Sequence, residues 1–163
     1  MASITHEVWI DAPRERVFHL LSSAKAIGTW WDEQTRKVTS EGIVLEHSPG
    51  PEHGTVRFLV LETEAPRLVR WRCVSTHPDN VPASEWTNTE IAFYIRKRSD
   101  SAEATEKWAE EIPARTVLRL EHTGWKEKAR YLPFCSYAWA MVLSNLCNKA
   151  MEDDGCHDQS ADD

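Results

Sequence analysis

The chain has 163 residues, of which 28% are charged, and its formal net charge is −7 at pH 7. This length fits one domain that buries roughly 70% of its unfolded surface, so neither a disulfide nor a metal is needed to stabilise it. The negative charge argues against a surface for nucleic acids or anionic membranes, because both require basic patches. Residues 1–10 lack the features of a signal peptide, so we expect a reduced, cytoplasmic setting.

The first third of the chain predicts a strand followed by two short helices. Apolar and polar residues alternate over 4–10, which is typical of a strand with one buried face. Pro13 suits the first turn of a helix, and we expect that helix to cover 14–21. Residues 24–31 predict a second short helical segment that ends in Trp30-Trp31. One of these two rings should enter the core while the other lies at its rim.

The middle of the chain predicts an antiparallel sheet. Segments 43–47, 55–62, 68–74, 86–96 and 115–122 are bounded by turn residues, and the longer ones alternate apolar with polar positions. The connection 97–114 is long for a hairpin. Its 102–112 part has a helix-forming composition, and we expect a mostly solvated excursion, with a lid as the alternative.

Residues 131–148 contain no charged side chain. Within them, one apolar stripe recurs at three- and four-residue steps and comprises Cys135, Ala138, Trp139, Val142, Leu143 and Leu146. A second stripe beside it comprises Phe134, Tyr137 and Met141. Polar residues interrupt the run, so it does not predict a membrane span. We expect a buried helix that is gripped by the sheet.

These elements predict a single domain over 1–151 and a disordered acidic tail over 152–163. Cys156-His157-Asp158, within the tail, is the only local cluster of metal-ligating residue types. We therefore expect no metal and no cofactor. Cys73 and Cys135 lie on apolar faces, which favours inert core thiols over nucleophiles.

Three segments in this order carry a family resemblance: residues 10–18 followed by Trp30-Trp31, residues 116–125, and Ala138-Trp139 with Leu143 and Leu146. Together they resemble the START/Bet v 1-like (SRPBCC) superfamily. Within it, the chain is similar to homologues of the C-terminal domain of the activator of the Hsp90 ATPase. The resemblance covers roughly residues 4–151.

The resemblance implies an α+β helix-grip fold, in which a curved antiparallel sheet wraps around a long C-terminal helix and two short helices follow the first strand. It also implies a cavity between sheet and helix, because relatives bind or process hydrophobic small molecules. Strand parity and the helix stripes then predict the residues that line the cavity: Trp31, Phe58, Trp71, Phe93, Leu118 and Leu120 as walls, closed by Trp125, Tyr137 and Met141, with Thr89 and Tyr137 as groups that orient a ligand.

His122 shares the parity of Leu118 and Leu120, so it should point inward unless a bulge near Gly124 intervenes. It is either a hydrogen-bonded core histidine or an acid–base group. Two functions follow. One is binding of a hydrophobic or aromatic small molecule, and the other is a cyclase-like or dehydratase-like enzyme with His122 as acid–base and Tyr137 as its helper. A third, a stress-response or Hsp90-type chaperone partner, follows from the resemblance alone.

Overall fold

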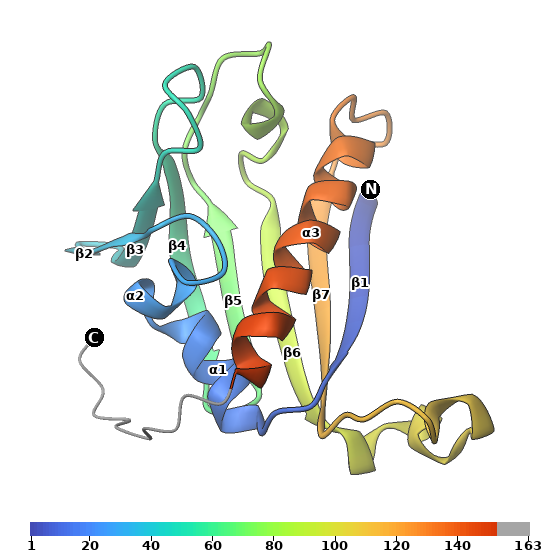
Figure 1. Ribbon diagram of the computed structural model, residues 1–163. Helices are drawn as coiled ribbons and strands as arrows, with labels where there is room; N and C mark the ends of the chain where they lie inside the picture. The colour runs from blue at the N-terminus through green and yellow to red at the C-terminus, as the bar shows by residue number, and fades with distance from the viewer. Residues whose placement is uncertain (153–163) are drawn as a thin grey trace.

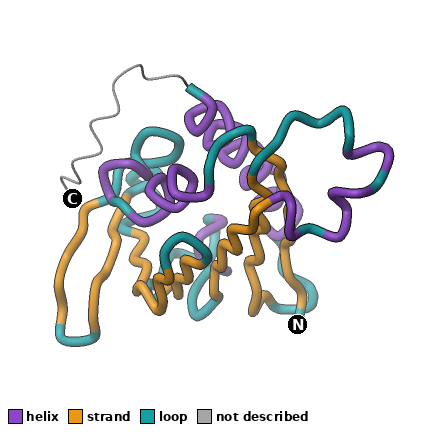
Figure 2. The backbone as a smooth tube through the Cα atoms, turned by 90° about the horizontal axis from the view of Figure 1, so that it is seen from below, coloured by secondary structure: helices purple, strands orange, loops and turns teal. Residues whose placement is uncertain are grey.

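Seven antiparallel strands form one open sheet, and the α-helices pack against a single face of it (Figures 1 and 2). The structure is a computed structural model that describes residues 1–152. The strand order is β1-β7-β6-β5-β4-β3-β2, so the last strand returns beside the first. The elements are β1 (Ala2–Ile10), α1 (Arg14–Ser22), α2 (Ala24–Ile27), β2 (Thr35–Thr39), β3 (Gly42–His47), β4 (Val56–Glu64), β5 (Leu68–Cys73), the 3-10 turn η1 (Pro82–Glu85), β6 (Glu90–Lys97), β7 (Thr116–Trp125) and α3 (Leu132–Met151).

The predicted helix-grip fold is confirmed. α3 lies along the side of the sheet formed by β1, β7 and β6 (Figure 1). Its buried residues Cys135, Trp139, Leu143 and Leu146 follow one stripe, because residues three and four positions apart share a helix face. The predicted tail and its Cys156-His157-Asp158 cluster lie outside the described residues.

Two polar contacts hold α3 at its ends. A ring nitrogen of His6 on β1 lies 3.0 Å from the carbonyl oxygen of Ser136 in the first turns. At the other end, the Arg16 guanidinium donates to the carbonyls of Lys149 and Ala150, at 2.8 and 2.6 Å. The last carbonyls of a helix have no partner inside it, and a cation there is stabilising. α1 therefore supplies a cap for α3.

The expectation that Phe134, Tyr137 and Met141 face the interior is wrong. These side chains are 61%, 67% and 53% exposed. The sheet covers α3 from one side only, and nothing in the described part of the chain packs on the opposite side of the helix. One stripe of the helix is therefore buried, and the second, which we call the outer stripe, remains in solvent.

Two strand assignments also differ from the sequence prediction. β2 was not predicted, because all five of its residues are exposed and their polarity does not alternate. It pairs only with β3, and the two form a ribbon that projects from the sheet (Figure 2). The segment predicted as a strand from Trp86 begins only at Glu90, because residues 86–89 form a turn in which Asn88 has φ 65°.

The excursion between β6 and β7 forms short 3-10 turns, η2 (Arg98–Asp100), η3 (Ala102–Thr105) and η4 (Lys107–Ala109), rather than an α-helix. The Arg98 guanidinium ties it together by donating to the carbonyls of Ala109, Ile112 and Ala114. Trp108 packs against Trp9 at a ring distance of 5.5 Å. The excursion projects beyond the ends of β6 and β7 (Figure 1). That position does not suit a lid.

Replacing Trp139 with alanine should lower the free energy of unfolding by about 3–5 kcal/mol, because a large buried aromatic side chain is lost. Tyr137→Ala is a matched control on the exposed face of the same helix, and it should change stability by less than about 0.5 kcal/mol. Urea denaturation followed by circular dichroism measures both. Equal losses in the two variants would contradict the orientation of α3.

Candidate functional site

Aromatic rings fill the space between the sheet and α3. Trp31, in the connection between α2 and β2, lies at the centre of this cluster. Its ring centroid is 5.0–6.5 Å from those of six other residues: Trp30, His47, Phe58, Trp71, Trp86 and Trp139. These separations are close to the range in which aromatic pairs stabilise one another. We call this group the aromatic cluster.

The structure places most of the predicted lining residues in the interior. Phe58, Trp71, Phe93, Leu118, Leu120 and Trp125 are all at most 1% exposed. Several are in direct ring contact, with Trp71 at 5.4 Å from Phe58 and 5.0 Å from Phe93. The expected walls therefore pack against one another. Tyr137 and Met141, which were expected to close the interior, belong to the outer stripe.

Trp125 faces the interior because of an irregularity in β7. The register between β1 and β7 shifts between Ala2 and Ser3, where Trp125 and Thr123 are the partners, so Gly124 is bulged out of the pairing. Gly124 has φ +91°, a conformation that residues with a Cβ rarely adopt. The extra residue turns Trp125 to the same side of the sheet as His122, whose ring is 4.8 Å away.

His122 faces inward, as strand parity predicts, and it is completely buried. The indole N–H of Trp139 donates to Nδ1 of His122 at 3.1 Å, so this nitrogen carries no proton. Nε2 therefore carries the proton of the neutral ring and donates to the Thr89 hydroxyl at 2.7 Å. The Thr89 hydroxyl in turn donates to the carbonyl of Trp86 at 2.6 Å. Each donor group in this series of hydrogen bonds has one acceptor.

These hydrogen bonds are typical of a histidine with a structural role. Burial lowers the pKa of His122 to about 3, so the ring is neutral at physiological pH. Both of its nitrogens are already bonded to protein groups, and no lone pair is free to accept a proton from a ligand. The Thr89 hydroxyl, which was expected to orient a ligand, is likewise engaged. Thr89 and His122 together connect the turn before β6, and β7, to α3.

The aromatic cluster reaches the surface at one margin. Trp31 and Trp86 are partly exposed there, whereas Trp30, Trp71 and Trp139 are at most 3% exposed. The indole N–H of Trp86 donates to the sulfur of Cys135 at 3.4 Å. We call this edge the Trp31–Trp86 margin. The sequence analysis missed Trp86, because its segment was assigned to a strand.

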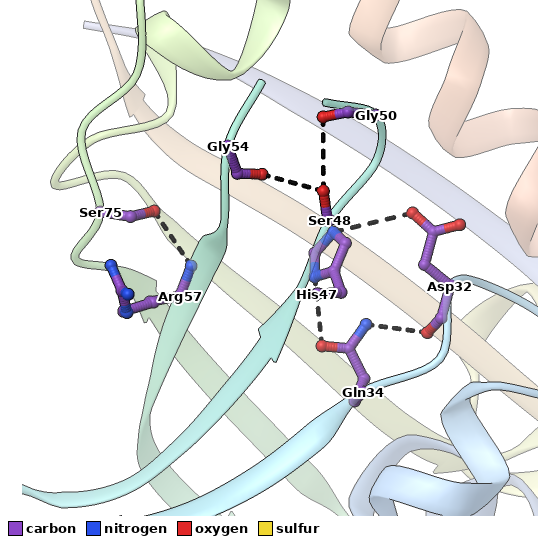
Figure 3. A network of polar contacts seen from close by, with 8 residues as sticks. All are labelled: Asp32, Gln34, His47, Ser48, Gly50, Gly54, Arg57 and Ser75. Carbon is purple, nitrogen blue, oxygen red and sulfur yellow. Dashed lines mark hydrogen bonds and ion pairs between the residues drawn. The ribbon is translucent and has the colours of Figure 1, made fainter. Parts of the chain in front are cut away.

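A polar network adjoins this margin (Figure 3). The side-chain amide of Gln34 donates to the carbonyl of Asp32 at 2.9 Å, and its oxygen lies 3.2 Å from Nδ1 of His47. The other nitrogen of His47, Nε2, is 3.8 Å from a carboxylate oxygen of Asp32. His47 also contacts the cluster, with its ring 5.0 Å from Trp31 and 5.5 Å from Phe58.

Burial perturbs both ionisable groups of this network. It lowers the pKa of His47 to about 4, with repulsion from His77 as a smaller cause, and it raises the pKa of Asp32 from its ordinary value. Sequence reasoning did not select His47. The sequence feature that could have identified it is its position two residues after Leu45, because alternate residues of a strand share a face. In the structure both side chains are buried.

The loops around this network are also fixed by hydrogen bonds. The Ser48 hydroxyl lies within 3.3 Å of the carbonyls of Gly50 and Gly54 and closes the loop between β3 and β4 (Figure 3). The Ser75 hydroxyl accepts from the backbone N–H of Arg57 and lies 2.8 Å from Nε2 of His77. These bonds hold the β3–β4 loop and the segment after β5 to their neighbours.

Within residues 1–152, no group of three or more His, Cys, Asp or Glu side chains is placed to hold a metal ion. Cys73 and Cys135 are buried, and burial raises the pKa of both thiols, as expected of core cysteines. None of the described helices is both long and apolar enough to span a bilayer.

Stability should fall as the pH drops below about 6.5, because the unfolded chain protonates His122 while the folded chain resists protonation until about pH 3. Within this window a buried neutral histidine costs about 1.4 kcal/mol per pH unit. His122→Gln should therefore show a shallower decline than the wild type in urea denaturation between about pH 6.5 and 4. His19→Gln, an exposed position on α1, is the control. Parallel profiles for wild type and His122→Gln would contradict a buried neutral His122.

Comparison with solved structures supports the fold. The Aha1 dimer from Colwellia psychrerythraea is 21% identical with a TM-score of 0.69, covering 92% of this chain and 96% of that one. CalU16 from Micromonospora echinospora is 19% identical with a TM-score of 0.61, covering 89% and 71%. DynU16, from the dynemicin biosynthetic locus, is 11% identical with a TM-score of 0.62, covering 90% and 46%.

No curated protein matches the chain. A family model does, and it bears the description "Activator of Hsp90 ATPase homolog 1-like protein". The match runs over residues 11–149, which includes the aromatic cluster, His122 and nearly all of α3. The chain belongs to this family of Hsp90 ATPase activator homolog 1-like proteins.

Proposed function

We propose that the protein binds an aromatic or otherwise hydrophobic small molecule between the sheet and α3, and that the ligand enters at the Trp31–Trp86 margin. The observation that carries this proposal is the partial exposure of two indole rings at the edge of an otherwise buried aromatic cluster. Small-molecule sites are lined mostly by hydrophobic and aromatic side chains with a few polar groups, and the residues at this margin are of those types. A ligand ring would make the same kind of contacts that the indoles make with each other.

Trp31 is suited to admit a ligand because of where it lies in the chain. It belongs to neither a helix nor a strand, yet its ring reaches six aromatic neighbours. Side chains on connecting segments move at lower cost than those on paired strands. A shift of this one ring would expose Phe58 and Trp139 to a ligand without breaking the sheet.

Binding without chemical conversion is the function that the geometry favours. The cyclase-like alternative used His122 as acid–base, but both nitrogens of that ring are bonded to protein groups. Its expected helper, Tyr137, lies on the solvent side of α3. DynU16 comes from a biosynthetic locus, which is consistent with a small organic ligand for this fold. The chaperone-partner alternative rests on the family description alone.

Indole N–H signals in a ¹⁵N NMR spectrum can test the proposal residue by residue. Titration with flavonoids, aromatic polyketides and fatty acids should shift the signals of Trp31 and Trp86, because a ligand at the margin changes their ring environment. Trp9 on β1 packs against Trp108 on the excursion, and both lie outside the aromatic cluster, so their signals are the internal control. The variants Trp31→Phe, Trp86→Phe and Trp108→Phe assign the corresponding signals, because each variant lacks one indole N–H.

Saturable shifts at Trp31 and Trp86, with Trp9 and Trp108 unchanged, would support the site. Two results count against it. One is a panel in which no compound shifts any signal, and the other is a response confined to Trp9 and Trp108.

A further inference from the structure

We propose that Asp32 and His47 form the polar end of this site and select ligands that carry a hydrogen-bond donor, a hydroxyl or an amino group, on an aromatic ring. The inference rests on the proposed function, and it adds a ligand class and two specificity residues to it. Neither residue belongs to the hydrogen-bond chain of His122.

The proton on His47 can be placed from its neighbours. The carbonyl of Asp32 can only accept, so the group of Gln34 that contacts it is the amide nitrogen. The oxygen of the same amide therefore faces Nδ1 of His47, which must carry the proton in order to donate to it. The neutral ring then presents a lone pair on Nε2. This nitrogen points toward the Asp32 carboxylate (Figure 3).

Two acceptors without a proton between them face one another at this point. The 3.8 Å between Nε2 of His47 and the Asp32 oxygen is too long for a hydrogen bond between them. A donor atom placed at an ordinary distance of about 2.8 Å from each of the two acceptors would bridge them. A hydroxyl can donate to one of the two acceptors, and an amino group has enough protons for both.

Asp32 and His47 lie beside the aromatic cluster, and this position indicates which other group the ligand carries. The side chain of His47 is only 2% exposed, whereas that of Asp32 is 45% exposed, so the pair extends from the interior to solvent. Asp32 follows Trp31 directly in the chain, and His47 contacts the rings of Trp31 and Phe58. A ligand donor at this pair would therefore place an attached ring against Trp31.

The charge at the site disfavours hydrophobic ligands that carry a carboxylate. Among residues 1–152, the partner of Asp32 within ion-pair distance is His47, which is neutral at physiological pH, and no lysine or arginine pairs with it. An uncompensated carboxylate repels another carboxylate. Fatty acids and aromatic acids should accordingly bind more weakly than phenols and aromatic amines of the same size.

Four naphthalenes of similar shape test the proposal by isothermal titration calorimetry. 2-Naphthol and 2-naphthylamine offer a donor, 2-methoxynaphthalene lacks one, and 2-naphthoate carries a negative charge. For the wild-type chain, we expect the two donors to bind about three- to tenfold more tightly than 2-methoxynaphthalene, the worth of one hydrogen bond. 2-Naphthoate should bind most weakly.

The double variant Asp32→Ala/His47→Phe removes both acceptors and should reduce the donor advantage to about twofold or less. Asp32→Ala alone leaves Nε2 of His47 as a neutral acceptor, so it should lower the advantage without abolishing it, because a hydrogen bond to a charged acceptor is the stronger one. Asp32→Ala should also strengthen the binding of 2-naphthoate. Glu33→Ala is the matched control, because it removes the neighbouring exposed carboxylate without touching the network, and it should keep the wild-type order. Dispersed amide spectra confirm that each variant is folded, and the lowered donor advantage in Asp32→Ala decides if the double variant is not.

The outcomes separate the two proposals. Equal affinities of the wild type for the donors and 2-methoxynaphthalene would overturn the polar end while the aromatic site stands. A donor advantage that is unchanged in Asp32→Ala, or that persists in the double variant, would also overturn it, because the donor would then bind elsewhere. If none of the four compounds binds, both proposals fail.

Discussion

One buried hydrogen bond, from the indole of Trp139 to Nδ1 of His122, connects the long helix to the sheet on which it lies. Each of the two polar groups would be costly to bury alone, by about 1–3 kcal/mol, so each requires the other in place. Thr89 and the carbonyl of Trp86 extend these hydrogen bonds from β7 to the turn at residues 86–89, which carries Trp86. The orientation of α3 and the position of the Trp31–Trp86 margin therefore depend on the same set of bonds.

The two buried histidines have different tasks because their partners differ. His122 has protein partners at both ring nitrogens and holds strands and helix together. His47 has a close partner at Nδ1 only, and its second nitrogen faces an acceptor rather than a donor. Burial keeps both rings neutral. The histidine that we propose for ligand recognition is therefore His47, at the edge of the aromatic cluster.

Most of the fold follows from local patterns in the sequence. The alternation in β7 correctly places Leu118, Leu120 and His122 inside, because a strand turns successive side chains to opposite faces. The helix pattern of α3 correctly gives its buried stripe. The outer stripe was misplaced because a periodic pattern shows which residues share a face but not how many layers cover the helix.

The candidate site was less accessible to sequence reasoning, since it depends on contacts between distant residues. Gln34 lies beside His47 only because β2 and β3 form a hairpin, and the exposed residues of β2 carry no strand signal. The partners of His122 depend on the turn at residues 86–89, which replaced an expected strand. Residue types alone identified His122 as a candidate, but its hydrogen bonds gave it a structural role.

Imidazole ¹⁵N NMR tests this division between the histidines most directly, because it shows which ring nitrogen carries the proton. The account predicts that His122 is protonated at Nε2 alone and His47 at Nδ1 alone at neutral pH. The signals of His122 should stay unchanged down to about pH 5, since its pKa is lowered to about 3. Titration of His122 near its ordinary pKa of about 6.5, or a proton on its Nδ1, would contradict the account.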